Sequence, residues 1–168
     1  LVRRHACPTD VFLDVARVLE PILRPALGRD FVSVFREARV EAERFALERS
    51  ATEETTLTEI WRCLKELIPE VEVAVGMEAE LQAEQSSVIP VPSCHAAIER
   101  ARAEFGRVIF ISDTYLPQSF IEEQLRQHGL MASGDVCFVS STEGLTKRSG
   151  RLFSMCLQRL GIEPASLT

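Results

Sequence analysis

Apolar residues in the first seventy positions recur every three to four residues, the spacing that places them on one face of an α-helix. The pattern predicts helices over residues 11–23, 31–48 and 57–69. Thr58 stands where an N-cap of the third helix is expected, and Trp61 falls on the apolar face of that helix. This part of the chain is therefore expected to be all-helical, with Trp61 in its core.

Residues 70–85 have a mixed pattern. They alternate like a strand at the start, but the acidic and alanine-rich remainder favours a helix, and a helix is therefore predicted. The acidic side chains of this stretch are expected to form a solvated helix face; they are Glu70, Glu72, Glu78, Glu80 and Glu84.

The pattern changes from about residue 92. Helices are predicted over residues 95–105, 117–129 and 149–161, each with a glycine at its end. Between them, residues 107–112 and 135–141 are short apolar runs of the kind found in strands that are buried on both faces. This alternation predicts parallel βα units, so the expected fold class is α/β: a Rossmann-like parallel sheet preceded by an all-helical N-terminal region.

Composition excludes some partners and sites. The net charge of −6 argues against nucleic acid as a partner. No apolar run approaches the roughly 20 residues of a membrane helix, and no signal-peptide pattern opens the sequence, so no membrane partner and a cytoplasmic location are expected. The five cysteines are odd in number and widely spaced, and the three histidines are scattered. Reduced, mostly buried thiols are expected, and no metal site.

Polar residues that could bind a ligand or take part in catalysis follow the two predicted strands. The first strand ends in Ser112, Asp113 and Thr114, and the second is followed a few residues later by Lys147 and Arg148. Ligands of open parallel sheets bind at the carboxyl ends of the strands. A hydroxyl, free backbone N–H groups and an ammonium are what a phosphoryl group requires, because they donate hydrogen bonds to its oxygens and offset its charge. The pattern thus indicates a phosphoryl-binding site.

Each piece also has an ordinary structural interpretation. Ser-Asp-Thr after a strand is a good turn and N-cap sequence, in which Asp113 would accept hydrogen bonds from free amides. Lys147 and Arg148 have the composition of a solvated surface pair. Their joint placement after neighbouring strands adds weight to the phosphoryl site and leaves the structural interpretations open.

Two longer stretches resemble a known family. RVIFISDTYLPQSFIEEQLRQHGL and GDVCFVSSTEGLTKRSGRLFSMCLQRLG look like the haloacid dehalogenase (HAD) superfamily of phosphohydrolases, in the branch often linked to glycosyltransferases. A strand followed by S-D-x-Y-L-P and a later T-K-R-S-G-x-L-F are typical of that branch. The resemblance implies that Ser112 hydrogen-bonds the transferring phosphoryl group and that Lys147 stabilises the nucleophile and the phosphoryl charge. Asp113, Thr114 and Arg148 are expected beside the substrate.

The opening LVRRHACPTDVF resembles the end of the family's first motif, with Arg3 as its arginine. The resemblance then divides the chain into the tail of the first core motif (1–5), a helical cap (6–92) and an α/β core segment (93–168). The family's nucleophilic and acid/base aspartates would lie before Leu1, and its fourth, metal-binding motif after the last residue. This chain is therefore expected to be a segment of a longer enzyme and inactive alone.

The resemblance also implies a reaction: hydrolysis of a small phosphomonoester through an aspartyl-phosphate intermediate. The implied cofactor is Mg²⁺, whose main ligands would lie outside this chain. The implied substrate is a small phosphorylated metabolite such as a phosphosugar, and the implied partner is a glycosyltransferase, fused to the protein or acting with it.

Other interpretations remain open. The chain could be a non-catalytic HAD-like interaction module, or a receiver-type signalling domain, although a receiver would need an Asp-ending strand where the pattern predicts helices. Among the other acids, Asp135 precedes its strand and is expected at the opposite edge of the sheet, whereas Glu143 either lines the site or is solvated. Cys137 falls within a strand and is expected to be a core residue.

Overall fold

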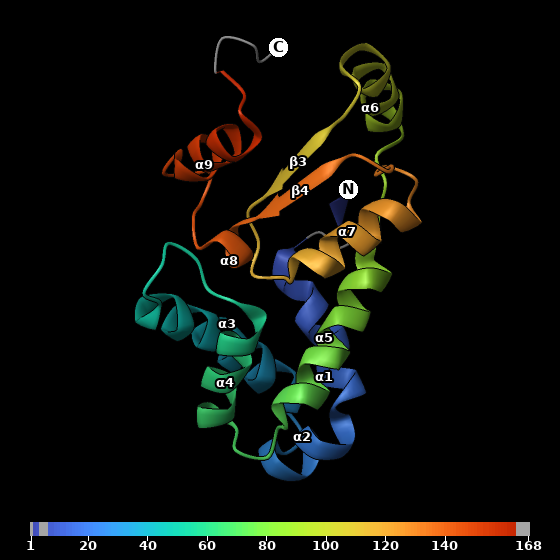
Figure 1. The fold of residues 1–168 in the computed structure, drawn as a ribbon. Helices are drawn as coiled ribbons and strands as arrows, with labels where there is room; N and C mark the ends of the chain where they lie inside the picture. The colour runs from blue at the N-terminus through green and yellow to red at the C-terminus, as the bar shows by residue number, and fades with distance from the viewer. Residues whose placement is uncertain (1, 4–6, 164–168) are drawn as a thin grey trace. The chain divides into compact units, whose positions relative to one another are not determined.

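The computed structural model describes residues 2–3 and 7–163, and in these ranges the chain is mostly helical, with a two-stranded parallel sheet in its second half (Figure 1). The chain forms two compact units. The helical unit consists of Leu1–Arg49 and Leu57–Ala97. The α/β unit consists of Ile98–Thr168 together with the short segment Ser50–Thr56.

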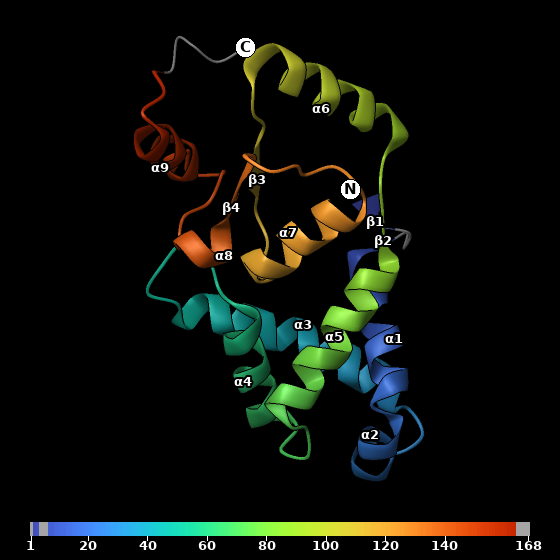
Figure 2. The same cartoon turned by 45° about the vertical axis from the view of Figure 1, so that its right-hand side comes forward.

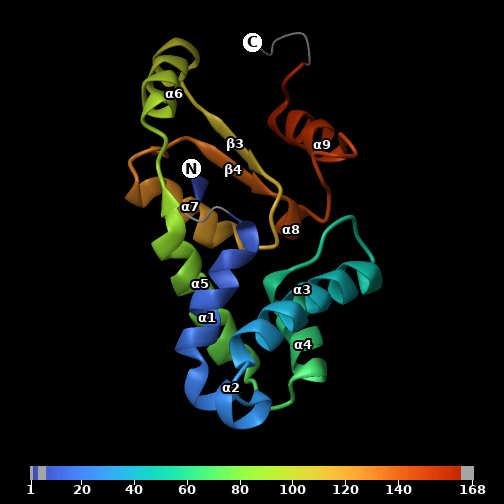
Figure 3. The same cartoon turned by 180° about the vertical axis from the view of Figure 1, so that it is seen from behind.

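The helical unit is built from amphipathic helices around a common core. Its elements are η1 (Pro8–Asp10), α1 (Val11–Val18), α2 (Glu20–Leu27), α3 (Phe31–Arg49), α4 (Leu57–Leu67) and α5 (Val73–Ser87), with a short antiparallel pair formed by β1 (Val2–Arg3) and β2 (Val88–Ile89). Helix α3 packs against α4, and α1 packs against both α5 and α3 (Figure 3). α6 (Pro92–Phe105) begins in this unit and ends in the α/β unit.

Two details of the predicted helices were wrong. The helix predicted over residues 11–23 is divided, since α1 ends at Val18 and α2 begins at Glu20. Pro21 explains the break, because proline has no N–H to donate to the carbonyl group four residues earlier in a continuous helix. Thr58 is the second residue of α4, not its N-cap.

The acidic run of α5 is not a solvated face throughout. Glu80 and Glu84 are completely buried. Glu80 accepts hydrogen bonds from Arg39 Nε (2.9 Å) and Nη2 (2.7 Å) on α3, and from Trp61 Nε1 (2.8 Å) on α4. A buried carboxylate is tolerated when a cation and further donors compensate for its lost hydration. The donors come from α3 and α4, so the sequence of α5 alone could not show that Glu80 is buried.

The α/β unit contains the predicted parallel strands. Its elements after α6 are β3 (Ile109–Ser112), α7 (Gln118–Gln127), β4 (Val136–Val139), α8 (Ser140–Glu143) and α9 (Arg151–Leu160). β3 and β4 are parallel, with register from Ile109↔Val136 to Ser112↔Val139. The prediction of parallel βα units is confirmed for these two strands. The short helix α8 was not predicted.

The sheet lies between α7 and α9 (Figure 2). Its side chains alternate between the two faces. One face packs against Leu125 of α7 and the other against Leu152 of α9. On the first face lie Phe110, Cys137 and Val139, and on the second Ile109, Ile111, Val136 and Phe138. Burial on both faces is confirmed for most of β4, whereas β3 is half-buried along its length. Helix α7 packs against β4 and adds to the burial of that strand.

The structure also bears on the cysteines and on membranes. All five thiols are free; Cys63, Cys137 and Cys156 are buried, whereas Cys7 and Cys94 are exposed. Burial raises the pKa of the Cys137 thiol to about 11, as suits a small core residue. Among residues 2–3 and 7–163, no helix has the length and apolar character needed to cross a membrane.

Candidate functional site

The carboxyl ends of β3 and β4 lie level with each other. Ser112 is the last residue of β3 and pairs with Val139, the last residue of β4. Just beyond the strands, the backbone N–H of Thr114 donates to the hydroxyl of Ser140 at 2.8 Å. The residues that follow the two strands therefore share one edge of the sheet, as the parallel arrangement predicts.

The loop after α8 returns to this edge. The backbone N–H of Lys147 donates to both carboxylate oxygens of Asp113, at 2.9 and 3.1 Å. Because Asp113 directly follows Ser112, these bonds bring the end of β3 and the loop of Lys147 together. Lys147 and Arg148 are exposed, and within residues 2–3 and 7–163 their side chains make no hydrogen bond or ion pair with the protein; the same holds for the half-buried Ser112 hydroxyl.

Asp113 and Thr114 have structural roles in this turn. Asp113 caps a backbone amide, but that amide belongs to the Lys147 loop and not to the turn after β3. The Thr114 hydroxyl accepts a hydrogen bond from the Leu116 N–H at 3.2 Å, which closes a local turn. Both residues thus shape the edge of the sheet at which β3 ends.

A residue that the sequence did not indicate completes the cluster. Glu53, from the segment Ser50–Thr56, accepts hydrogen bonds from the Thr146 N–H (2.9 Å), the Ser149 hydroxyl (2.6 Å) and Arg151 Nη1 (2.8 Å). These donors, the Ser149 hydroxyl first, lower the pKa of the Glu53 carboxyl to about 2. The carboxylate is therefore ionised at any physiological pH.

The neighbouring Glu54 binds the same edge. Its carboxylate accepts a hydrogen bond from the Ser140 hydroxyl at 2.9 Å, and its carbonyl group accepts one from the Ser50 hydroxyl at 2.7 Å. The Glu53 N–H donates to the carbonyl group of Gly144 at 3.1 Å. SATEETT has the composition of an ordinary polar loop between two helices, so no local signal distinguishes it.

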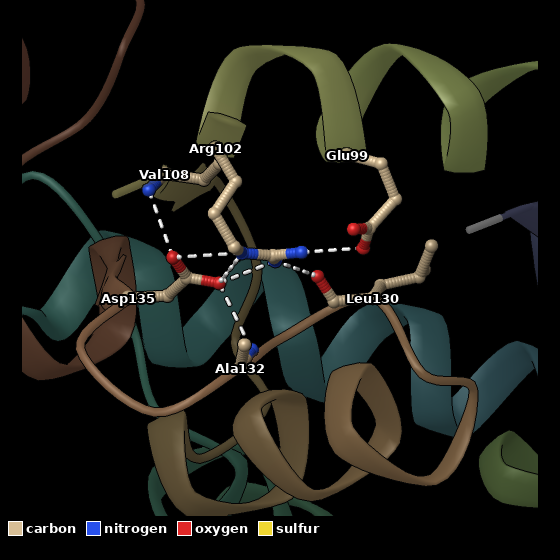
Figure 4. A network of polar contacts seen from close by, with 6 residues as sticks. All are labelled: Glu99, Arg102, Val108, Leu130, Ala132 and Asp135. Atoms are coloured by element: carbon tan, nitrogen blue, oxygen red, sulfur yellow. Dashed lines mark hydrogen bonds and ion pairs between the residues drawn. The ribbon is translucent and has the colours of Figure 1, made fainter. Parts of the chain in front are cut away.

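Asp135 lies at the opposite edge of the sheet, as predicted, within a polar network (Figure 4). It accepts hydrogen bonds from Arg102 on α6, from the Val108 N–H at 2.8 Å and from the Ala132 N–H at 2.9 Å. Burial acts to raise the pKa of this carboxyl, but the hydrogen bonds, led by that of Arg102, outweigh it and lower the pKa. The network joins α6 to the loop before β4, and in the part of the chain that the structure describes none of its hydrogen bonds reaches the candidate site.

Glu143 fits neither of its two expected roles. Its carboxylate forms a bidentate ion pair with Arg159 of α9 at 2.8 and 2.9 Å, and its side chain is only 12% exposed. It therefore neither lines the site nor is solvated. Across the described part of the chain, no three or more His, Cys, Asp or Glu side chains are grouped so that they could hold a metal ion.

Comparison with known proteins does not assign the chain to a family. No protein-family model matches the chain, and no curated protein matches it. Chemically, the edge offers one hydroxyl, one ammonium and one guanidinium that have no protein partner in the described ranges, on a turn held by carboxylates. Such a group of donors suits an anion with several oxygens.

Proposed function

We propose that the α/β unit supplies the phosphoryl-binding half of a HAD-type phosphohydrolase, with the helical unit as its cap. The observation that carries this proposal is the double hydrogen bond between the Lys147 N–H and the Asp113 carboxylate. It joins the two motifs that resemble the family, although 34 positions separate them in the sequence. The fold, in this proposal, is an incomplete Rossmann-like HAD core.

The proposed roles follow from the side-chain chemistry. The Ser112 hydroxyl donates a hydrogen bond to an oxygen of the transferring phosphoryl group. The Lys147 ammonium offsets the negative charge that spreads over the phosphoryl oxygens in the transition state, and this kind of preorganised charge is often the largest catalytic contribution. Thr114 and Arg148 stand beside them as weaker substrate contacts, and Asp113 acts through the backbone of Lys147.

The nucleophile comes from another strand. Within the described residues, β3 pairs with β4 on one side only. Its side chains are half-buried and mostly apolar, so the unpaired side of β3 is suited to a further strand. We place the family's aspartate-bearing strand there. Its carboxylate would attack phosphorus as the ester O–P bond breaks, a second aspartic acid would protonate the leaving oxygen, and water would then hydrolyse the aspartyl phosphate to inorganic phosphate.

The cofactor and substrate enter the proposal through the resemblance alone. The described residues do not supply a ligand set for Mg²⁺, so the metal would be bound by carboxylates outside them. The substrate class is a small phosphorylated metabolite such as a phosphosugar, and the partner is a glycosyltransferase.

The first prediction concerns Lys147 and Ser112. In the protein as its open reading frame encodes it, with Mg²⁺ and p-nitrophenyl phosphate, we expect turnover that a chelator abolishes. Lys147→Ala should lower kcat about a hundredfold or more, because it removes charge stabilisation in the transition state. Ser112→Ala should cause a smaller loss, since it removes a single neutral donor.

Lys65 provides a matched control, because it is the only other lysine in the sequence and lies on α4 of the helical unit, where it binds Glu72. Lys65→Ala should retain the parental kcat on this aryl phosphate. Absence of turnover on a broad panel of phosphate esters, or a Lys147→Ala variant as active as its parent, would favour the non-catalytic interaction module instead.

A further inference from the structure

The turn that carries Lys147 is held on both sides by carboxylates. Asp113 binds the backbone N–H of Lys147 itself, and Glu53 binds the residues on either side, Thr146 and Ser149. We propose that Glu53 is a positioning residue that sets the backbone geometry from which the Lys147 ammonium reaches the phosphoryl group. This inference rests on the proposed function and adds to it a residue that the family resemblance does not mark.

The division of labour between the two Glu53 oxygens supports this role. Oε2 accepts from the Thr146 N–H (2.9 Å), the Thr146 hydroxyl (3.2 Å) and the Ser149 hydroxyl (2.6 Å), whereas Oε1 accepts from Arg151 Nη1 (2.8 Å). One oxygen thus collects the donors of the turn, and the other binds the first residue of α9. The carboxylate therefore links the residues on both sides of Lys147.

Glu53 is itself well anchored. Its backbone N–H donates to the Gly144 carbonyl group at 3.1 Å, and Gly144 lies so close to the segment that an added Cβ would come within 2.9 Å of Thr52. Gly144 also has a φ of +67°, which favours glycine. The Ser50 hydroxyl donates to the Glu54 carbonyl group at 2.7 Å and so closes the segment on itself. A carboxylate on a fixed backbone can hold a turn in place.

The charges are arranged so that Glu53 does not neutralise the catalytic candidate. The ion pair of Glu53 is with Arg151, at 2.8 Å. Lys147 is exposed, and in the described ranges its ammonium has no ion pair. A carboxylate that only balanced surface charge would have no need of the two hydroxyls and the amide of the turn. The contacts of Glu53 therefore fit support of the backbone better than screening of Lys147.

A double-mutant cycle in the encoded protein tests the inference. Glu53→Gln should lower kcat on p-nitrophenyl phosphate by about tenfold or more, because small displacements of a catalytic group have large effects on rate. Since Glu53 acts through Lys147, Glu53→Gln combined with Lys147→Ala should be no slower than Lys147→Ala alone. Losses that multiply in the double variant, or an unchanged kcat in Glu53→Gln, would overturn the inference.

Glu122→Gln is the matched control. Glu122 lies on α7 in the same unit, its side chain is 22% exposed against 24% for Glu53, and it too pairs with an arginine, Arg126 at 2.7 Å. Its carboxylate binds Gln118 and Arg126 of its own helix, and among the described residues it has no hydrogen bond or ion pair with the turn, so its removal should leave kcat unchanged. If Glu122→Gln lowered kcat as much as Glu53→Gln, the effect would be one of general stability and the inference would fall.

Amide hydrogen exchange separates this inference from the phosphatase proposal. In Glu53→Gln the amides of Thr146 and Lys147 should exchange faster than in the parent, whereas in Glu122→Gln they should not. If the encoded protein shows no turnover but these amides respond, the phosphatase proposal fails while the support of the turn by Glu53 stands. If the amides do not respond, the support of the turn is refuted, with or without turnover.

Discussion

Gly76 shows how much a single position on α5 depends on its neighbour across the core. A Cβ added at Gly76 would come within 2.0 Å of Trp61 Cζ3, whose indole is completely buried. The same indole donates its N–H to Glu80, one helical turn along α5. Glycine at this position therefore lets Trp61 pack closely against α5 and reach a buried carboxylate.

Gly76→Ala is expected to destabilise the helical unit. In an exposed helix interior this change would add about 1 kcal/mol of stability through helix propensity. Here overpacking against Trp61 should outweigh that gain and lower the free energy of unfolding by about 1–3 kcal/mol. Urea denaturation followed by Trp61 fluorescence measures the effect, with the exposed Val75→Ala as control. A stabilised Gly76→Ala would show that the indole can move aside without loss.

Helices α3, α4 and α5 are joined by one buried polar cluster. Arg39 and Glu80, both completely buried, form a bidentate pair between α3 and α5, and Trp61 adds a donor from α4. The guanidinium also lies over the ring of Phe12, 4.5 Å from its centroid, on α1. The side chains of this cluster thus connect α3, α4, α5 and α1.

Removing one partner of this pair should be worse than removing both charges. Glu80→Gln removes the buried carboxylate of the pair and leaves the Arg39 guanidinium with the more exposed Glu43, at 3.0 Å from its Nη1, so we expect a loss of about 3 kcal/mol in the free energy of unfolding. Arg39→Met combined with Glu80→Gln should recover part of that loss, because both charges of the buried pair are removed. The carboxylate of Glu43 loses Arg39 as a partner but is 42% exposed, and the introduced amide oxygen can still accept from Trp61. The same urea experiment decides this. A double variant less stable than Glu80→Gln would contradict it.

Element boundaries could be predicted where local chemistry controls them. Gly106, Gly129 and Gly161 end α6, α7 and α9 with positive φ, as the positions of glycine in the sequence predicted. The break between α1 and α2 at Pro21 has an equally local cause, although the apolar spacing continues across it. The strands β1 and β2 were not predictable, because two-residue pairings have no periodicity to detect.

Two acidic side chains, Glu53 and Asp135, support opposite edges of the sheet in the α/β unit. Glu53 supports the edge at the carboxyl ends of the strands, and Asp135 supports the opposite edge through Arg102. The pKa values of both carboxyls are lowered in the fold, that of Glu53 to about 2. Both therefore bind fewer protons in the folded chain than in the unfolded chain, so acid should weaken the unit.

The α/β unit should lose stability as the pH falls from about 4.5 towards 2, because unfolded carboxyls have pKa values of about 4 and take up protons first. Above that window the stabilisation is complete. Amide hydrogen exchange of β3 and β4 at stepwise lower pH measures the loss, which should be smaller in Glu53→Gln since that variant has no carboxyl to protonate. An equal loss in both proteins would show that Glu53 does not contribute.

Local sequence was sufficient for most of the helices, for the parallel pair β3 and β4, and for the expectation that Ser112 and Lys147 lie at one edge of the sheet. Periodicity and strand order carry that information, because side chains repeat with the secondary structure. Local sequence could not show that Glu80 is buried, or that Glu53 accepts a hydrogen bond from Thr146, 93 positions away. Such contacts join residues whose neighbours in the sequence look like ordinary polar surface, and they arise only when the folded backbone brings donor and acceptor together.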